Sequence, residues 1–429
     1  MMQIETYDVV VVGGGPSGST AATDLARKGY SVLLLDRAGR IKPCGGAVPP
    51  RLIKDFEIPD HLICAKVTGA RIISPTNRVI DMPIDDGGYV GMVDRDVFDE
   101  WLRARAESHG AIRRTGTFER IDRDSDGVSR VSYRAPGSDT AKIEVRARCV
   151  IGADGANSAV AHQAVPSTKK TPFVFAYHEI IRTPSPEQIA KQPKSSSAFD
   201  AKRCDVFYQG TYSPDFYAWI FPHGDTTSVG TGSAHKGFSL RSAVGALRES
   251  TGLDQTETIR REGAPIPLRP HKRWDNGRDV VLAGDSSGVV APASGEGIYY
   301  AMYGGRLAAD ATDQFLQTGD ARALATARKR FMKEHGMVFR VLGVMQYFWY
   351  SNDKRRERFV SMCADPDVQR LTWQSYMHKE LVWTSPIAHV KIFFKDLAHL
   401  LGLVAPEGLT TKQKKKQQQP VTMEAERIV

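Results

Sequence analysis

The sequence has little cysteine and no spacing of residues that is typical of a metal site. Five cysteines occur among 429 residues, none in a C-x-x-C pair, at Cys44, Cys64, Cys149, Cys204 and Cys363. This odd and scattered set argues against a disulfide framework or a zinc site and fits a reducing compartment. The histidines are equally scattered, so no metal is predicted, and these five are interpreted as surface or core residues: His162, His178, His223, His235 and His271.

The chain also lacks a long apolar run. No stretch approaches about 18 uncharged apolar residues, so no transmembrane helix is predicted. The amino terminus runs directly into an apolar strand, so we expect no signal peptide. The 41% hydrophobic and 25% charged residues are typical of a soluble globular protein with two or three domains. We therefore expect a cytoplasmic protein.

Acidic residues are fewer than basic ones, and the formal net charge is +9. Such a charge could favour an anionic substrate, an acidic membrane surface or nucleic acid, or it could describe no more than a generally basic surface. Because the sequence has no basic and aromatic nucleic-acid module, no nucleic acid partner is predicted. The oligomeric state is left open.

The first forty residues contain the strongest local pattern. Residues 8–12 form an apolar, β-branched run that is typical of a buried parallel strand. Glycines then follow in the G-x-G-x-x-G spacing. A helix is expected over 20–28 and a second strand over 31–35. Strand, glycines, helix and strand in this order predict a dinucleotide-binding unit.

The residues of this unit have separate predicted roles. Gly13 permits a tight turn, Gly15 lets the backbone approach a pyrophosphate, and Gly18 lets helix and strand pack closely. The helix amino terminus offers free N–H groups and a positive dipole end to the phosphates. Asp36, at the end of the second strand, is placed to accept hydrogen bonds from a ribose diol.

The next part of the chain alternates loops, strands and one helix. Residues 37–50 are rich in glycine and proline and predict a shaped loop beyond the carboxyl ends of the strands, where ligands bind. Short strands are expected over 67–90 and 112–150. Asp94 is interpreted as the N-cap of a helix to about residue 109, whose apolar face contains Val97, Phe98, Trp101, Leu102 and Ala106.

The pattern of a strand followed by a small-residue turn with one acid occurs twice more. Residues 150–158 contain Asp154, and residues 280–285 end in Gly284 and Asp285. Between them, 173–266 is rich in β-branched and aromatic residues and predicts a second sheet. The fold class is therefore expected to be α/β, with a Rossmann-like nucleotide-binding domain interrupted by a β-rich α+β domain.

Helices are expected to form the carboxyl-terminal part. Residues 298–316 and 321–404 have helical patterns, and one amphipathic face contains Val390, Phe393, Phe394, Leu397, Leu401 and Val404. This face could contact a membrane or pack on the protein's own core. The lysine- and glutamine-rich segment 410–429 is interpreted as a disordered tail.

These three motifs together resemble the para-hydroxybenzoate hydroxylase class of FAD-dependent flavoproteins. The resemblance implies that Asp285 and the Gly295–Ile298 segment approach the flavin, and that Arg95 contacts FAD, although Arg95 could instead be a helix-surface charge. The FAD site would include Gly13, Gly15, Pro16, Ser17, Gly18, Asp36, Arg37, Arg95, Asp154, Gly284, Asp285, Pro292, Gly295, Gly297 and Ile298. No second glycine fingerprint is present, so NADPH, the expected reductant, would visit the flavin only transiently.

Within that class the sequence is similar to the geranylgeranyl reductases from about residue 5 to 404. Pro43-Cys44-Gly45-Gly46 matches the family loop near the flavin, although Ala47 stands where a third glycine is frequent. Tyr217-Ala218-Trp219-Ile220-Phe221-Pro222 matches the family motif of the substrate domain. The region around residues 379–381 and 393–397 resembles the branch that acts on the tail of (bacterio)chlorophyll.

The resemblance implies catalytic residues Cys44, Gly45 and Gly46 and substrate-binding residues Tyr217, Trp219, Phe221 and Pro222. On a strand, the three aromatic side chains share one face and could line a prenyl pocket or simply belong to the core. Cys44 could tune the flavin, place or protonate the substrate, or fill a small apolar gap.

The resemblance also implies a division into domains. The FAD-binding domain is expected over 1–66, 93–165 and 276–318, and the β-rich substrate domain over 67–92 and 166–275. A helical region is expected over 319–404 and a disordered tail over 405–429.

The implied function is FAD-dependent reduction of three C=C bonds of a geranylgeranyl group to phytyl. The substrate would be geranylgeranyl-(bacterio)chlorophyll, geranylgeranyl diphosphate, or both, with peripheral contact to a photosynthetic membrane. Two alternatives are a flavin monooxygenase of the same fold that acts on an apolar substrate and a non-catalytic flavin- and pigment-binding assembly protein.

Overall fold

The computed structural model describes residues 4–37, 41–85, 87–137, 142–165, 171–192 and 198–379. The predicted amphipathic face between residues 390 and 404 and the predicted tail lie outside these residues. Within the described part, no helix is both long enough and apolar enough to cross a membrane.

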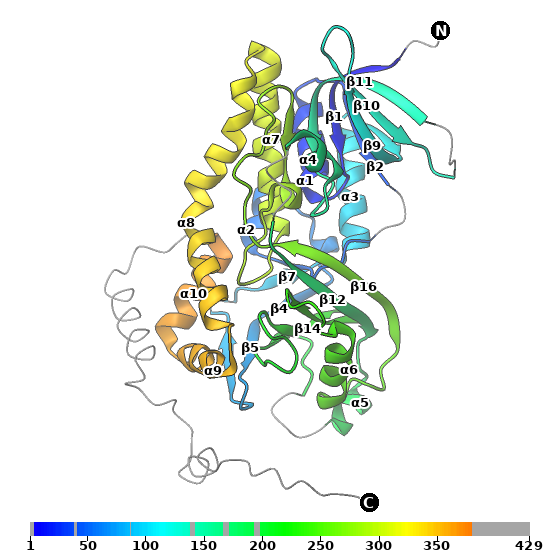
Figure 1. The fold of residues 1–429 in the computed structure, drawn as a ribbon. Coiled ribbons are helices and arrows are strands. Elements are labelled where there is room, and N and C mark those ends of the chain that lie inside the picture. The colour runs from blue at the N-terminus through cyan, green and yellow to red at the C-terminus, as the bar shows by residue number, and fades with distance from the viewer. Residues whose placement is uncertain are drawn as a thin grey trace, which may run out of the picture.

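The first sheet is built around the strand that precedes the glycine motif (Figure 1). β1 (Thr6–Val12) lies between β2 (Val32–Asp36) and β11 (Lys142–Gly152), and pairs in parallel with both. β8 (Ile112–Thr115) and β17 (Val280–Leu282) extend the parallel part. The antiparallel part has two strands, β9 (Thr117–Arg123) and β10 (Ser129–Arg134). β1, β2 and β11 are apolar and buried where they pair in parallel near their carboxyl ends, because both faces of a parallel sheet are covered there.

Helices cover this sheet. α1 (Pro16–Arg27) packs against α3 (Arg95–Ser108) and α7 (Ile298–Thr318), and the short α4 (Ala159–Ala164) contacts β9. α1 begins four residues earlier than the predicted start at residue 20, because Pro16 occupies the first helical turn, where a missing N–H has no consequence. The predicted helix over 298–316 is confirmed by α7.

The apolar face predicted for the 94–109 helix is partly wrong. Phe98, Leu102 and Ala106 are fully buried, but Val97 is 56% exposed. The buried residues follow a four-residue spacing, and Val97 lies about 100° around the helix from Phe98. Asp94 does precede α3, but its side chain makes no capping hydrogen bond and is instead directed to His223.

The second sheet has seven strands in the order β16-β12-β15-β14-β13-β5-β6. All neighbours are antiparallel except β13 and β5. Two strands from the earlier part of the chain therefore join five later ones. The bounds are β5 (Gly69–Ile73), β6 (Val79–Pro83), β12 (Phe173–Arg182), β13 (Arg203–Phe207), β14 (Ala218–His223), β15 (Thr226–Ser233) and β16 (Thr258–Pro267).

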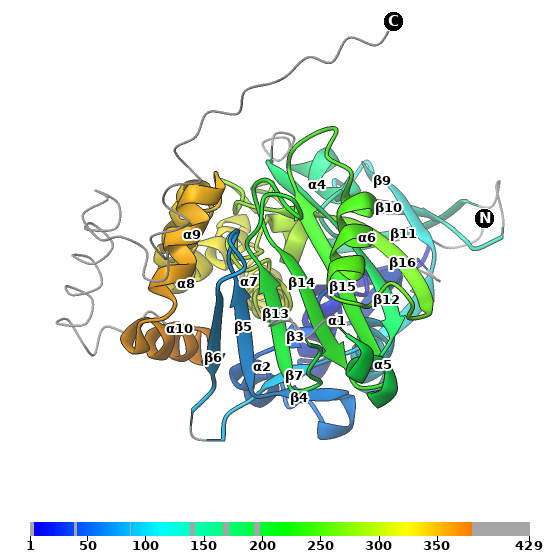
Figure 2. The ribbon, with the colours of Figure 1, turned by 90° about the horizontal axis from the view of Figure 1, so that it is seen from below.

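Two helices occur where the sequence predicted only strands. α5 (Pro186–Lys191) is short, and α6 (Leu240–Ser250) covers β12 and β15 (Figure 2). The apolar residues of α6 recur at helical spacing, so Val244 and Leu247 reach a core with Ile181 and Val229 of the sheet. One face of the second sheet is thus covered by a helix, which the sequence analysis missed because the surrounding composition is β-rich.

Short elements connect the two sheets. A small sheet consists of β3 (Ala47–Val48), β7 (Val90–Met92) and β4 (Ala65–Val67), and α2 (Pro50–Asp55) follows β3. The residues that the structure describes also contain three 3₁₀ turns: η1 (Asp60–Leu62), η3 (Gly284–Ser287) and η4 (Ala321–Ala325).

The predicted helical region is confirmed for its described part. α8 (Thr326–Trp349) runs along the molecule, with Phe331 packed in the core of the first sheet and Trp349 in that of the second (Figure 1). α9 (Asp353–Met362) and α10 (Pro366–His378) lie beside the β6 edge of the second sheet (Figure 2). The helical region therefore forms one wall of the space next to that sheet.

Candidate functional site

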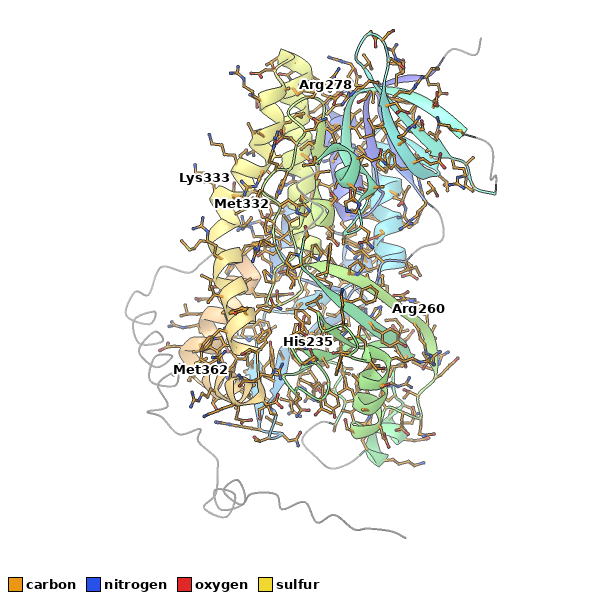
Figure 3. The ribbon with its side chains drawn as sticks, in the orientation of Figure 1. His235, Arg260, Arg278, Met332, Lys333 and Met362 are labelled. Carbon is orange, nitrogen blue, oxygen red and sulfur yellow. The ribbon has the colours of Figure 1, made fainter. Side chains whose placement is uncertain are left out.

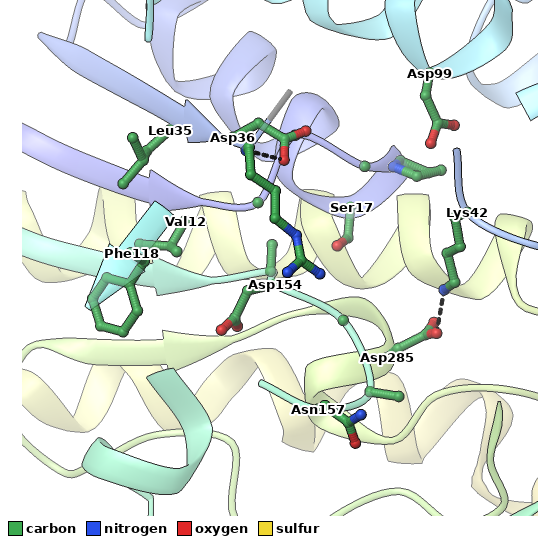
Figure 4. A pocket seen from close by; sticks show the side chains of 18 of the residues that line it. Val12, Ser17, Leu35, Asp36, Lys42, Asp99, Phe118, Asp154, Asn157 and Asp285 are labelled. Atoms are coloured by element: carbon green, nitrogen blue, oxygen red, sulfur yellow. Dashed lines mark hydrogen bonds and ion pairs between the residues drawn. The ribbon is translucent and has the colours of Figure 1, made fainter. Parts of the chain in front are cut away.

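A cavity of about 250 Å³ lies at the carboxyl ends of β1, β2 and β11, and we call it the glycine-lined cavity. Three segments form most of it: residues 12–17, 35–37 and 153–157. Figure 4 shows Asp36, Asp154 and Asp285 around it. Of the predicted FAD-binding residues, the following line it: Gly13, Gly15, Pro16, Ser17, Asp36, Arg37, Arg95, Asp154 and Asp285. Their contact with FAD remains a prediction.

The three glycines of the fingerprint have different surroundings. Gly13 has a φ of +108°, and a Cβ there would lie 2.2 Å from the carbonyl oxygen of Ala153. A Cβ at Gly18 would lie 1.8 Å from the carbonyl oxygen of Gly13, so only glycine allows α1 to approach β1 this closely. A Cβ at Gly15 would meet no atom within 4 Å, which means that the space above it is free for a ligand. This open cradle fits a pyrophosphate.

Local hydrogen bonds hold the side chains of Asp36 and Asp154 in the glycine-lined cavity. The N–H of Arg37 donates to Asp36 Oδ1 at 2.7 Å, and Arg103 Nη1 lies 3.4 Å from Oδ2. Asp154 accepts from the Ser158 hydroxyl and from the N–H of Val160, and so holds the start of α4. Burial raises the pKa of both Asp36 and Asp154 above the usual range.

The glycine-lined cavity adjoins a second cavity at a group of shared residues: Pro16, Lys42, Arg95, Ala264, Pro265, Asp285 and Ala301. Lys42 and Asp285 form an ion pair across the junction (Figure 4). Arg95 binds both carboxylate oxygens of Asp99, at 2.8 and 2.7 Å, and is only 5% exposed. The alternative interpretation of Arg95 as a helix-surface charge is therefore wrong.

The charge of Arg95 is balanced by its surroundings. Burial opposes the charge, but Asp99 and then Cys44 hold the pKa of the guanidinium above its usual range. The half-buried Cys44 therefore has a guanidinium among its neighbours, although this guanidinium is already paired with Asp99. Lys42 is likewise paired, with Asp285.

The second cavity, of about 350 Å³, has mainly apolar walls, and we call it the aromatic cavity. Tyr217, Trp219 and Phe221 all line it, with ring centroids 6.0 Å and 6.2 Å apart along the strand. The other aromatic rings in its wall come from elements far apart in sequence: Tyr177, Tyr208, Phe216, Tyr350, Phe359, Trp373 and Tyr376. Pro222 is buried but does not line either cavity, because alternation on the strand directs it to the opposite face.

The Pro-Cys-Gly-Gly loop forms one side of the aromatic cavity. A Cβ at Gly45 would lie 3.0 Å from the ring of Phe221. Gly46 has a φ of +72°, and a Cβ there would lie 2.4 Å from the ring of His223. Ala47, which replaces the third family glycine, is accommodated in β3. The two adjacent glycines thus let the loop pack directly on the strand that carries the aromatic residues.

His223 holds this loop in place, a role that the sequence analysis did not predict. Its Nε2 lies 3.1 Å from the carbonyl oxygen of Gly45, which can only accept, and its Nδ1 lies 3.0 Å from Asp94 Oδ1. These contacts connect β14, the start of α3 and the loop. The available signal was the two-residue alternation, which continues from Tyr217 through Phe221 to His223.

Cys64 completes a cluster around His223. The potential ligand atoms of Cys64, Asp94 and His223 lie within 4.8 Å of one another, a spacing that could hold a metal ion. Burial and the Asp94 carboxylate, however, raise the pKa of the Cys64 thiol to about 12, and the thiol donates to the carbonyl of Met92. The hydrogen bonds of these residues hold the loop, so we interpret the cluster as an anchor of the loop.

The segment that precedes α7 forms the far wall of the aromatic cavity. Gly295, Gly297 and Ile298 line it, and the N–H of Gly295 donates to the carbonyl of Ala291 at 2.9 Å. The amino terminus of α7 begins here, which favours negative charge nearby. Pro292, Gly18 and Gly284 line neither cavity. Gly284 instead packs closely on Ser17, where a Cβ would lie 2.5 Å from the hydroxyl oxygen.

Comparison with protein families gives two matches. Residues 61–331 match the FAD binding domain family, which covers more than half of the chain, and residues 8–57 match the FAD dependent oxidoreductase family. The open cradle at Gly15 and the acid at the end of β2 fit the pyrophosphate and ribose of such a cofactor.

Individual relatives match almost the whole chain. It is 58% identical over 401 residues to geranylgeranyl diphosphate reductase of Rhodobacter capsulatus, covering 94% of this chain and 99% of that protein. It is 35% identical to geranylgeranyl diphosphate reductase of a Synechocystis strain, covering 92% and 97%. The chloroplastic enzyme of Arabidopsis thaliana is 34% identical, with 92% and 85% covered.

Solved structures share the fold. A geranylgeranyl bacteriochlorophyll reductase-like protein from Thermoplasma acidophilum superimposes with a TM-score of 0.73 at 22% identity, covering 90% of this chain and all of that one. The flavin-dependent brominase Bmp2 follows with a TM-score of 0.69 at 18% identity, covering 91% and 99%. The fold is therefore shared with flavoproteins of different activities, and the sequence relatives are more specific. The chain belongs to the geranylgeranyl diphosphate reductase family of FAD-dependent oxidoreductases.

Proposed function

We propose that this protein reduces three of the four C=C bonds of a geranylgeranyl group to give a phytyl group for (bacterio)chlorophyll. The observation that carries the proposal is the junction of the two cavities. An apolar, aromatic cavity opens at Lys42, Arg95 and Asp285, beside the residues that we expect to hold FAD. The identity to geranylgeranyl diphosphate reductases supports the same activity.

Separate segments of the chain would bind the separate parts of FAD at the two cavities. The backbone of residues 13–17 would hold the pyrophosphate, Asp36 the ribose, and the 295–298 segment would face the flavin. When bound, FAD supplies hydride-transfer chemistry, while the protein supplies position, electrostatics and a dry cavity. Position matters here, because an isolated alkene has no carbonyl that could share the developing charge.

The aromatic cavity suits a prenyl tail better than a compact substrate. Its walls combine the three alternating rings of residues 217–221 with Tyr350, which directly follows α8, and with rings from α9 and α10. Burial of an isoprenoid chain against such walls contributes roughly 25 cal/mol per Å² and requires few polar anchors. A tail held in this way could slide between successive reductions. We propose geranylgeranyl-(bacterio)chlorophyll and geranylgeranyl diphosphate as substrates.

We further propose NADPH as the reductant and a peripheral contact with the membrane that holds the substrate. α8 exposes four apolar side chains within one arc of the helix, at 50%, 42%, 67% and 84% exposure: Met337, Val341, Val344 and Tyr347. Figure 3 shows Lys333 on the outer side of the same helix. Exposed apolar residues next to basic ones favour a membrane surface.

The proposal is tested anaerobically with the purified protein loaded with FAD. One tube contains NADPH and geranylgeranyl-bacteriochlorophyll, and a second contains NADPH and geranylgeranyl diphosphate. We expect mass gains of two, four and six hydrogens in at least one tube. Matched tubes with dithionite in place of NADPH, and without any donor, separate the choice of donor from the reduction itself.

Other results would contradict the proposal in different ways. Oxidation of NADPH only after oxygen is admitted, with an oxygen atom added to the substrate, would indicate a monooxygenase. Tight binding of pigment and FAD, without any change in prenyl mass under either reductant, would indicate a non-catalytic assembly protein.

A further inference from the structure

Glu296, in the wall of the aromatic cavity, has one carboxyl oxygen without a hydrogen-bond partner. Glu296 lies between the two glycines of the segment before α7, and its side chain is only 6% exposed. Its Oε2 is paired with Lys379, whereas its Oε1 is buried and unpartnered. Among the described acids that line this cavity, Glu296 alone has such an oxygen. A buried polar atom of this kind costs stability unless a ligand or a proton satisfies it.

Other titratable groups in the cavity wall are already occupied by partners. Lys42 is paired with Asp285, Arg95 with Asp99, and His178 with both Glu262 and Ser228. The hydroxyl groups of four tyrosines in the wall are also hydrogen-bonded, to carbonyl or side-chain oxygens: Tyr177, Tyr208, Tyr217 and Tyr350.

The buried thiols and phenols of this wall are weak acids. Burial raises the pKa of Tyr376 and of Cys204 well above their ordinary ranges, and burial does the same for Tyr217. Efficient general acid catalysis requires a group whose pKa is closer to the working pH. Two other groups of this wall, Cys44 and Glu296, remain to be compared as proton sources.

Lys379 is placed to support Glu296. It directly follows α10, its side chain is 2% exposed, and its Nζ lies 3.8 Å from the ring centroid of Tyr376. Tyr299 and Tyr300 of α7 lie at 5.9 Å and 5.8 Å on other sides, so the ammonium is enclosed by aromatic rings and one carboxylate. Its backbone φ of +57° is rare for a residue with a side chain. Such a conformation persists when the surrounding contacts over-determine it.

Glu296 and Lys379 shift each other's pKa in opposite directions. Burial raises the pKa of Glu296, and Lys379 opposes that effect. Burial lowers the pKa of Lys379, and Glu296 opposes it in turn. The pair is therefore able to hold a proton on the carboxyl group and to stabilise the carboxylate once that proton has left.

We propose that Glu296 is the proton donor of the alkene reduction and that Lys379 is the residue that positions it. This inference rests on the proposed function, which supplies the hydride from reduced FAD. The alkene π bond breaks, one carbon forms a bond to the hydride, and its neighbour forms a bond to the proton that leaves the O–H bond of the Glu296 carboxyl group. The Lys379 ammonium neutralises the carboxylate that remains, which takes its next proton from water.

The test uses the full-length protein loaded with FAD and reduced with dithionite under anaerobic conditions. Glu296→Gln keeps the size of the side chain and an oxygen for Lys379, but it removes the acidic proton. We expect FAD affinity and flavin reduction within about twofold of the wild type, and prenyl reduction slower by about 10²- to 10⁴-fold, the usual range for a general acid. Glu296→Asp should recover part of the rate.

A second readout does not depend on activity. Infrared spectra of the FAD-loaded wild type should contain a carbonyl band of a protonated carboxyl group that shifts in D₂O and is absent in Glu296→Gln. Asp205→Asn is the matched control, because Asp205 is also buried and ion-paired, with Arg203, and burial raises its pKa as well, but it lies outside both cavities. The control should retain both the band and the rate.

The outcomes separate this inference from the function on which it rests. Prenyl reduction by Glu296→Gln within threefold of the wild type, or an unchanged carbonyl band, would overturn the inference while leaving the reductase intact. The same holds if Cys44→Ser abolishes prenyl reduction and Glu296→Gln does not. Lack of reduction by the wild type itself would instead refute the proposed function, and this inference with it.

Discussion

The two cavities meet at Lys42 and Asp285 but are built in different ways. The glycine-lined cavity is formed mostly by three short segments at the carboxyl ends of neighbouring parallel strands, and much of its surface is backbone. The aromatic cavity is formed mostly by side chains that come from residues between 16 and 376, on the second sheet, the small sheet, loops and several helices. Recognition by backbone requires a local arrangement of glycines, whereas recognition by side chains requires the complete fold.

The acidic residues of the cavities also differ from several at the surface, in the direction of their pKa shift. Burial raises the pKa of the cavity acids Asp36, Asp154 and Glu296. At the surface, hydrogen bonds from arginine lower the pKa of other acids, as Arg71 does for Asp81 and Arg113 for Glu100. The surface acids therefore favour the folded state when ionised, while the cavity acids oppose it. Acids that reduce stability in this way are typical of functional sites.

The largest effect should come from the glycine that packs α1 on β1. We expect Gly18→Ala to destabilise the fold by about 3 kcal/mol, because its Cβ would lie 1.8 Å from the carbonyl oxygen of Gly13 and would force the helix away. FAD binding should be lost as well. Denaturant unfolding of the apoprotein and FAD titration measure the two effects.

Gly15→Ala is the matched control for this substitution. Its backbone φ of −75° is compatible with alanine, and its Cβ would meet no atom within 4 Å. We expect stability within about 0.5 kcal/mol of the wild type but FAD affinity at least about tenfold weaker, equivalent to 1.4 kcal/mol. Equal losses of stability in the two variants would contradict the separate roles of these glycines.

The next prediction concerns the aromatic cavity alone. Val206 lies on β13 and lines this cavity but not the other. We expect Val206→Phe to fill part of the cavity and to raise the KM for the prenyl substrate by about tenfold, which corresponds to 1.4 kcal/mol of lost binding. FAD affinity should stay within twofold. Val206→Ala, which leaves the space open, is the control, and weaker FAD binding in Val206→Phe would show that the cavities are not independent.

The sequence predicted the glycine-lined cavity better than the aromatic one, for a physical reason. The fingerprint, Asp36 and Asp285 each follow an apolar strand, so their position was readable from neighbouring residues. The rings on β14 were also predicted, because alternation places them on one face. Val97 was misplaced because an exposed valine and a buried one look alike in a short helical pattern.

Glu296 and Lys379 both lie in segments that the sequence analysis noted, but their pairing depends on a distant contact. Glu296 and Lys379 are 83 residues apart and meet only after α7 and α10 have packed. His223 reaches the loop at Gly45 across 178 residues. Alternation along the strand indicates which face His223 occupies, but no local pattern identifies the distant partner of His223 or of Glu296. These pairings therefore follow from the fold.

The smallest predicted effect tests whether a cavity acid reduces stability while it supports binding. Burial raises the pKa of Asp36, with Arg103 and the N–H groups of Arg37 and Gly14 opposing that effect and Asp99 adding to it. Between the ordinary pKa and the raised one, the folded protein binds more protons than the unfolded chain. Stability of the apoprotein should therefore fall as the pH rises through this window. FAD affinity should change in the opposite direction, because only the ionised carboxylate accepts both hydrogen bonds from the ribose.

Asp36→Asn removes this titration, and thermal unfolding and FAD titration across the acid range measure its effect. At neutral pH we expect the variant apoprotein to be slightly more stable than the wild type and to bind FAD about fivefold more weakly, close to 1 kcal/mol. The pH dependence of both quantities through the window should become flatter. If the apoprotein instead loses stability together with FAD affinity, Asp36 stabilises the fold as the surface acids do, and the contrast between cavity and surface acids fails at this residue.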